Sequence, residues 1–225
     1  MNNLIPGLNT SMITNNPHDV ATTVQLMVLL TVLSLAPAIL LLMTSFTRII
    51  IVLSFVRTSL STQQMPPNQV LIGLALFLTF FIMAPVYHQI NHDALNPYLK
   101  GTISQKQAVK KAQDPLKVFM AKETRQKDLA LFMNYGHYKQ PKTVTDIPMT
   151  ALVPAFTISE LKTAFEMGFM VFIPFLVIDM VVASILMAMG MMMLPPVMIS
   201  LPFKILLFIM VDGWYLIVKS ILSSY

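Results

Sequence analysis

The chain has 225 residues, of which 56% are hydrophobic and only 11% are charged. An ordinary globular protein carries about 25% charged residues, so this composition argues against a soluble enzyme. The absence of cysteine excludes disulfides, zinc–thiolate sites and iron–sulfur clusters. Nucleic-acid binding has little support, because basic residues are interleaved with acidic ones and no reader motif occurs.

The net charge of +5 is confined to one segment. Residues 91–146 hold ten basic and five acidic residues, whereas the remaining 169 residues carry five charges of each sign. Flanks so poor in charge are typical of a lipid environment or of a tightly buried helical assembly.

The first half of the chain predicts a polar tail and an apolar helical hairpin. Residues 1–19 lack the basic start and adjoining apolar stretch of a secretory signal peptide. Residues 20–43 are uncharged, long enough as a helix to span a membrane, with Pro37 as a candidate kink. Arg48 and Arg57 bracket a short apolar run that predicts a connecting turn. Residues 70–87 then form a second uncharged run, which is barely long enough to span a membrane.

The second half predicts a hydrated insert followed by another apolar hairpin. We expect helix near residues 104–133 and turns at Asn96–Pro97, Tyr135–Gly136 and Gln140–Lys142. The apolar run 167–203 is too long for one span, and Gly190 with Pro195–Pro196 divides it into a helix and a returning segment. The expected fold is all-α, with domain limits at 1–19 (tail), 20–88 (first hairpin), 89–150 (basic helical insert) and 151–225 (second hairpin).

The most unusual composition lies between Met187 and Met198, where six of twelve residues are methionine: Met187, Met189, Met191, Met192, Met193 and Met198. Flexible, polarizable thioethers could fill an irregular core or close around substrates of differing shape. A third interpretation is a copper(I) site, because soft thioethers bind that ion, although neither Cys nor His lies nearby. The Gly-Pro-Pro bend favours a deformable gasket in a pore.

Five charges interrupt the apolar second half: Glu160, Glu166, Asp179, Lys204 and Asp212. Each is costly in lipid, so each is expected to face protein or water. One interpretation is an ion or proton pathway, and the other is a buried ion pair that sets helix register in an oligomer. Because Asp179 stands alone in its segment, we favour pairing, with Lys204 as the expected partner of a carboxylate.

Two weaker features complete the pattern. Small residues form a close-packing strip at Gly168, Ala183, Ser184, Ala188 and Gly190. His88 and His92 share a helix face but lack the glutamate of a metalloprotease motif, so they predict a water interface and not a metal site. No phosphate loop, nucleophile elbow or dinucleotide fingerprint occurs, and no catalytic residue or cofactor is expected.

Several stretches resemble the FliP/SctR family of type III secretion export-gate proteins. They are Thr44–Phe55 (TSFTRIIIVLSF), Gln63–Leu71 (QQMPPNQVL), Glu160–Phe165 (ELKTAF), Pro174–Met180 (PFLVIDM), Met189–Met193 (MGMMM), Leu201–Lys204 (LPFK) and Val211–Trp214 (VDGW). They cover both apolar halves, and the central insert matches less firmly. Thr47–Arg48 and Pro66–Asn68 are more similar to the flagellar members than to the injectisome members.

The resemblance implies a pore-forming, non-enzymatic subunit through which unfolded flagellar subunits cross the cytoplasmic membrane. It implies a pentamer joined by FliQ and FliR, near FlhA, FlhB and FliO in the flagellar basal body. In the family a methionine-rich loop forms the pore gasket, here Met189 to Met193, and buried charges map to Glu160, Asp179 and Lys204. The assembled gate sits largely above the bilayer, so segments of spanning length need not span.

The resemblance also places the insert on the extracytoplasmic side, whereas ten basic residues would favour the cytoplasmic side by the positive-inside rule. A function of another class stays open at this point. It is a secondary transporter subunit in which Asp179 carries protons.

Overall fold

The computed structural model describes residues 26–27, 30–31, 34, 37–38, 41–62, 65–191 and 193–225. The chain divides into two compact units, residues 1–40 and 41–225. In the first unit the described residues are helical, and the Thr31 hydroxyl donates to the Met27 carbonyl. The predicted polar tail, most of the first predicted span and Met192 lie outside the described residues.

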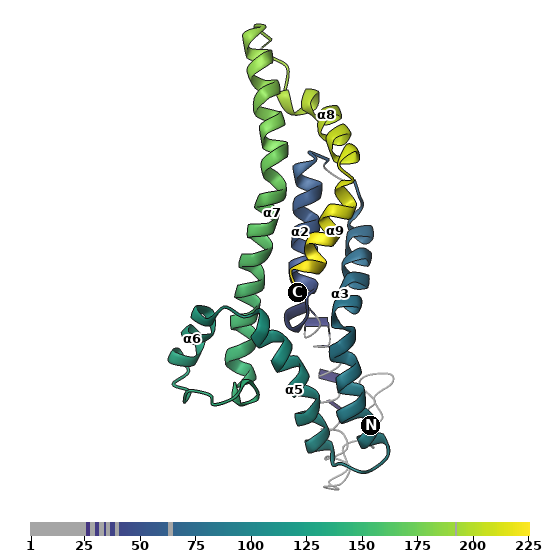
Figure 1. Ribbon diagram of the computed structural model, residues 1–225, viewed down its shortest axis with the longest axis vertical. Helices are drawn as coiled ribbons and strands as arrows, with labels where there is room; N and C mark the ends of the chain where they lie inside the picture. Colours follow the sequence, from purple (N-terminus) through teal and green to yellow (C-terminus); the bar gives the residue numbers. More distant parts are fainter. Residues whose placement is uncertain are drawn as a thin grey trace, which may run out of the picture. The chain divides into compact units, whose positions relative to one another are not determined.

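The second unit is all-α over the residues that the structure describes, as the sequence predicts (Figure 1). Its longer elements are joined by a π-helical turn, η2, and a 3₁₀ turn, η3. In chain order the elements are α2 (Phe46–Ser59), α3 (Asn68–Ile90), η2 (Asn91–Leu95), α4 (Asn96–Leu99), α5 (Gln105–Glu123), α6 (Gln126–Tyr135), η3 (Val144–Asp146), α7 (Met149–Ala188), α8 (Pro196–Met210) and α9 (Gly213–Ser223).

Helix α2 is the central packing element of this unit, in contact with both α7 and α3 (Figure 1). Its apolar residues Ile49, Val52, Leu53 and Val56 follow helical spacing and are almost completely buried. The predicted connecting turn between Arg48 and Arg57 is therefore wrong. The segment is a buried helix because the charge of Arg48 is neutralised by residues distant in sequence.

The helical run that begins at α3 is longer than predicted. It continues through η2 and α4 from Asn68 to Leu99, so the expected turn at Asn96–Pro97 is wrong. Pro97 is the second residue of α4 and directly follows the π-helical turn η2, so the run accommodates proline in its last turns. The run is apolar enough to cross a membrane.

The helical stretches predicted over 104–133 are two helices, α5 and α6, which are separated at Thr124–Arg125. Helix α5 begins at a capping box, in which Ser104 and Gln107 bond reciprocally to each other's main-chain amides. Met120 and Met133 from these helices pack with Leu152 and Phe156 of α7 in one apolar cluster. The insert and the start of α7 therefore share a core.

Helix α7 spans 40 residues and starts well before the predicted apolar segment at 167. It ends at a turn where Gly190 adopts a φ of +74°, a conformation that glycine tolerates best. The chain then returns along α7 as α8, as the sequence predicts. Helices α8 and α9 meet at a bend of 63° at Asp212, whose φ is 52°.

Among the described residues, two helices are long and apolar enough to cross a membrane, Asn68–Leu99 and Met149–Ala188. The bent pair α8 and α9 adds a third if it acts as one span. Four spanning segments were expected from the sequence, and the first of these lies mainly outside the described residues.

Candidate functional site

The methionine cluster occupies the turn between α7 and α8. Most of its side chains are exposed: Met187, Met189 and Met198 are each more than 60% exposed and Met193 is 98% exposed, while Met191 is half-buried. Gly190 lies at the centre of the turn with open space around its Cα. Within one chain these thioethers therefore fill no core, so they are available to another molecule.

A copper(I) ion at this turn would have thioethers as its ligands. In the part of the chain that the structure describes, no group of three His, Cys, Asp or Glu side chains could hold a metal ion. The residues around the turn are apolar, with Leu194 and Val197 exposed beside the methionines. A soft, apolar and deformable rim is the chemistry that this turn offers.

Below the turn, Asp179 and Lys204 form an ion pair between α7 and α8. The Lys204 Nζ donates to Asp179 Oδ2 at 2.6 Å and to the Ser61 hydroxyl at 2.6 Å. Ser200 donates a further bond to the other oxygen of Asp179. The Lys204 side chain is 1% exposed and that of Asp179 is 26% exposed. Lys204 pairs with a carboxylate as predicted, and every amine and carboxylate in this group has a partner.

A second network surrounds Arg48 in the core. Its guanidinium donates to both carboxylate oxygens of Glu160, with Nε to Oε2 at 3.0 Å, and to Glu123 Oε2 at 3.0 Å. Arg48 and Glu160 are almost completely buried. The fork of guanidinium donors matches the two oxygens of Glu160 and so fixes α2 against α7.

The same network includes the residues that follow α9. Arg48 Nη1 donates to the Ser224 carbonyl at 2.9 Å and to its hydroxyl at 3.0 Å. The Tyr225 hydroxyl donates to Glu160 Oε2 at 2.6 Å. Burial, together with the nearby charge of Glu160, raises the pKa of the Tyr225 phenol well above its ordinary value, so this group stays a donor.

A third group of polar residues ties the insert to α7. Ser159, completely buried, accepts from the Arg125 amide at 3.0 Å and donates to Asp128 at 2.7 Å. The Arg125 side chain pairs with Glu166 at 2.8 Å. Together with the Arg48 network, these contacts cross the predicted boundary between insert and second hairpin at two points.

The five predicted buried charges are not equally buried. Glu160 and Lys204 are buried and Asp179 is partly buried, whereas the Glu166 side chain is 55% exposed and Asp212 is exposed. Glu166 lies on the outward side of α7 and Asp212 at the bend, which explains why both remain accessible. The pairs were expected between subunits, but those of Glu160, Glu166, Asp179 and Lys204 form within one chain.

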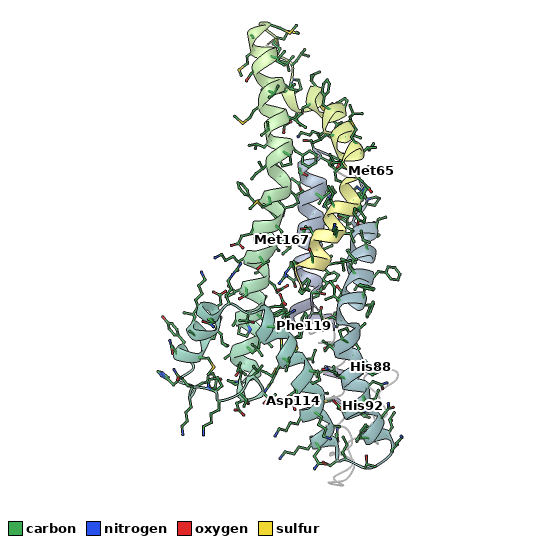
Figure 2. All side chains as sticks on the ribbon, in the orientation of Figure 1. Met65, His88, His92, Asp114, Phe119 and Met167 are labelled. Atoms are coloured by element: carbon green, nitrogen blue, oxygen red, sulfur yellow. The ribbon has the colours of Figure 1, made fainter. Side chains whose placement is uncertain are left out.

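The remaining candidates stay apart from these networks. Gly168 is buried where its Cα faces the Phe55 ring, while Ser184, Ala188 and Gly190 are exposed. Figure 2 shows His88 and His92 on one helical run, distant from the methionine turn. His92 contacts only Asp93, at 2.7 Å, among the interactions of the described residues.

Comparison with known families adds the decisive observation. A model described as "FliP family" matches residues 29–221, which include the methionine turn and every charge of the pairs above. The chain belongs to the FliP family. Membership of this family confirms the resemblance found in the sequence.

Relatives in the FliP family extend over nearly the whole chain. The chain is 70% identical over 211 residues to a flagellar biosynthetic protein FliP of Bacillus subtilis (strain 168), covering 94% of this chain and 96% of the relative. A FliP of Pectobacterium carotovorum subsp. carotovorum is 51% identical over 98% of this chain and 86% of the relative. A FliP of Aquifex aeolicus (strain VF5) is 49% identical over 90% and 85%, respectively.

Sequence reasoning missed four members of the Arg48 network: Arg48 itself, Glu123, Ser224 and Tyr225. The sequence could have predicted that Arg48 is paired, since an arginine flanked by apolar residues requires a buried anion. No sequence pattern identified Glu123, Ser224 or Tyr225 as its partners, because they are separated from Arg48 by 75 or more positions.

Proposed function

We propose that this chain is a pore-forming subunit of the flagellar type III export gate. In this proposal it passes unfolded flagellar subunits across the cytoplasmic membrane and has no catalytic role. Family membership over residues 29–221 and the names of the relatives support the flagellar part of the proposal. The observation that carries the pore part is the methionine turn, whose side chains are exposed to other molecules.

The physical properties of that turn suit a seal. A passing unfolded chain presents side chains of every size, so a rigid rim would either block it or leak around it. Unbranched thioethers repack at little cost, and they can close against one another when no chain is present. Met189, Met191, Met192 and Met193 form the proposed gasket, with Met187 and Met198 as flanking candidates.

Assembly is the second part of the proposal. Large apolar side chains cover the outer sides of α7 and α8, including Met170 at 71% exposed and Met210 at 76% exposed. Such surface is expected to be covered in the working protein. We place lipid and neighbouring subunits there, in a homopentamer that joins FliQ and FliR, with FlhA, FlhB and FliO nearby. In this arrangement the insert lies on the extracytoplasmic side of the inner membrane.

No contact among the described residues favours the alternative in which Asp179 carries protons. A proton carrier must gain and lose its proton during transport, whereas Asp179 is held by a direct ion pair with Lys204 and a bond from Ser200. Lys204 and Ser200 thus occupy one carboxylate oxygen each.

The gasket is tested by replacing Met191, Met192 and Met193 together with alanine. Shortening three side chains removes the atoms that meet across the closed pore. We expect resting cells that contain the variant complex to leak small ions and solutes, measured as loss of membrane potential and uptake of an otherwise excluded dye. The control is Met65→Ala, because Met65 is also an exposed methionine, at 66%, but lies before α3 (Figure 2).

Complex assembly is verified in each strain by the amount of extracted complex. Leakage in the triple variant and none in the control supports the gasket. A fully assembled triple variant that holds its membrane potential like the parent contradicts it.

A further inference from the structure

Helix α9 is fixed chiefly at its end, by the two residues that follow it. Ser224 accepts from the Arg48 guanidinium through both its carbonyl and its hydroxyl. Tyr225 donates to Glu160, and its hydroxyl lies 3.3 Å from the Ser45 carbonyl. Lys122 also donates to the main-chain oxygen of Tyr225. Partners from α2, α5 and α7 thus converge on two residues.

The Tyr225 ring contacts both a guanidinium group and an aromatic ring. The Arg48 guanidinium carbon lies 3.9 Å from its centroid, and the Phe119 ring of α5 stacks against it at 6.0 Å with an angle of 16° between the planes. Stacking of this kind adds to the hydrogen bonds that the hydroxyl makes. The side chain is therefore positioned by a cation, an aromatic ring and a carboxylate at once.

The rest of α9 is packed much less closely. Gly213, Ile217 and Ile221 are its only buried residues, about one per turn, whereas Tyr215 is 59% exposed and Leu216 is 49% exposed. A cavity of about 270 Å³ separates the middle of the helix from α2 and α7, lined by Val52, Met167, Met170, Val171, Ile217 and Ser220. An interface with such a void gives weak dispersion contact.

The start of α9 is a sharp bend in the chain. Asp212 takes a left-handed backbone conformation, with φ of 52°, at the 63° bend. Gly213 is covered by the Phe208 ring, so closely that an added Cβ would lie 2.3 Å from ring atoms. Helix α9 therefore has a bend at one end, a void beside its middle and a dense polar contact at its other end.

We propose that Ser224 and Tyr225 form a latch, which holds α9 against α2, α5 and α7 and whose release lets α9 swing about the bend at Asp212. Because α9 continues from α8, the latch also fixes the end of the segment that carries Lys204 and starts at the methionine turn. The latch is independent of the proposed export function, since it is defined by the position of α9 alone.

The test is hydrogen–deuterium exchange of the full-length protein, in its detergent-extracted assembled form, for the parent and two latch variants. Tyr225→Ala removes the ring and the hydroxyl, and Tyr225→Phe removes only the hydroxyl. Ser223→Ala is the matched control, because the Ser223 hydroxyl bonds to the Ser220 carbonyl within α9 and to no other group among the described residues. Exchange is compared between the α9 peptide and peptides from α3 and α7.

For Tyr225→Ala we expect the α9 amides to exchange roughly tenfold faster or more, while α3 and α7 stay within about twofold of the parent. Tyr225→Phe is expected to give a smaller acceleration confined to α9, and Ser223→Ala none. Exchange of α9 that is unchanged in both latch variants would overturn the proposal. Equal acceleration in α9, α3 and α7 would also overturn it, because Tyr225 would then stabilise the whole core and not one movable helix.

Discussion

Arg48 shows how one residue can organise a helical unit that is otherwise poor in charge. It is 1% exposed, and its guanidinium is shared by Glu160 and Glu123, with Ser224 accepting at the third side. A buried cation is tolerated only when its charge and its donors are all satisfied. Arg48 therefore links α2 to α7 and α5 through its two carboxylate partners, and to the residue after α9 through Ser224.

The first prediction concerns Glu160→Gln, which keeps the shape of the side chain but removes its charge. Removing one partner of a buried pair leaves the other charge uncompensated, so we expect a loss of about 3–5 kcal/mol in the free energy of unfolding. Denaturation of the detergent-extracted protein measures it. Glu166→Gln on the same helix is the control. Its ion pairs are largely exposed, and a loss below about 1 kcal/mol is expected.

A comparable loss in both variants would contradict the central role of the Arg48 network. Equal, small losses would mean that solvent reaches Glu160 as easily as it reaches Glu166.

The second prediction distinguishes pairing from proton carriage at Asp179. Asp179→Asn leaves the buried Lys204 ammonium without its anion, so we expect export of flagellar subunits to fall by roughly tenfold or more. Adding Lys204→Gln removes the unpaired charge and lets two amides bond. We expect the double variant to regain most of the lost export, measured as secreted flagellar protein. Continued loss in the double variant would support proton carriage and contradict pairing.

At the scale of elements, the sequence predicted the features that depend on local pattern. The all-α class, the break at Gly190 with Pro195–Pro196 and the return of α8 along α7 all follow from apolar runs and turn residues. The limits of α7 and of the α3 run were predicted too short. Each helix continues into a segment with charged residues, because helix formation does not require an unbroken apolar run.

The sequence predicted part of the candidate site, namely the methionine turn and the pair of Asp179 and Lys204. Composition alone located the methionine turn, because six methionines in twelve residues need no fold to be recognised. Lys204 and Asp179 were also matched from sequence, since few charges were available to pair. The Arg48 network was not predictable, because its members become neighbours only when α2, α5, α7 and α9 pack together.

The third prediction concerns the contact between α2 and α7. A Cβ at Gly168 would lie 2.4 Å from Phe55 ring atoms and 3.0 Å from the Phe55 Cβ, and that ring packs edge-on against Phe165. Gly168→Ala therefore forces α2 and α7 apart, and we expect about 1–3 kcal/mol of destabilisation in thermal or chemical unfolding. Gly73→Ala on α3 is the control.

No heavy atom lies within 4 Å of a Cβ built at Gly73, so alanine there gains helix propensity. We expect Gly73→Ala to be neutral or stabilising by up to about 1 kcal/mol. If Gly168→Ala were as well tolerated as this control, close packing of α2 on α7 at Phe55 would be refuted.

At the scale of the whole molecule, the charge distribution divides the chain into apolar helices and a basic, hydrated insert. The apolar helices leave large exposed side chains that require lipid or other subunits, while the basic residues gather on the insert. The insert nevertheless shares a core with α7 through Met120, Met133 and Phe156. The domain limit near residue 150 stays a prediction about topology, and movement of the insert relative to α7 would require breaking that core.

The central claim is that exported chains pass the methionine turn. Because the chain has no cysteine, one cysteine at position 193 gives a unique chemical label. The measurement is crosslinking between Met193→Cys and an exported flagellar subunit that is halted in transit by a fused, folded domain. The control is Tyr135→Cys on the insert, since Tyr135 is similarly exposed, at 81%. We predict an adduct at position 193, dependent on the halted subunit, and little at position 135. No adduct at 193 in an assembled, export-competent complex, or equal adducts at both positions, would contradict the account.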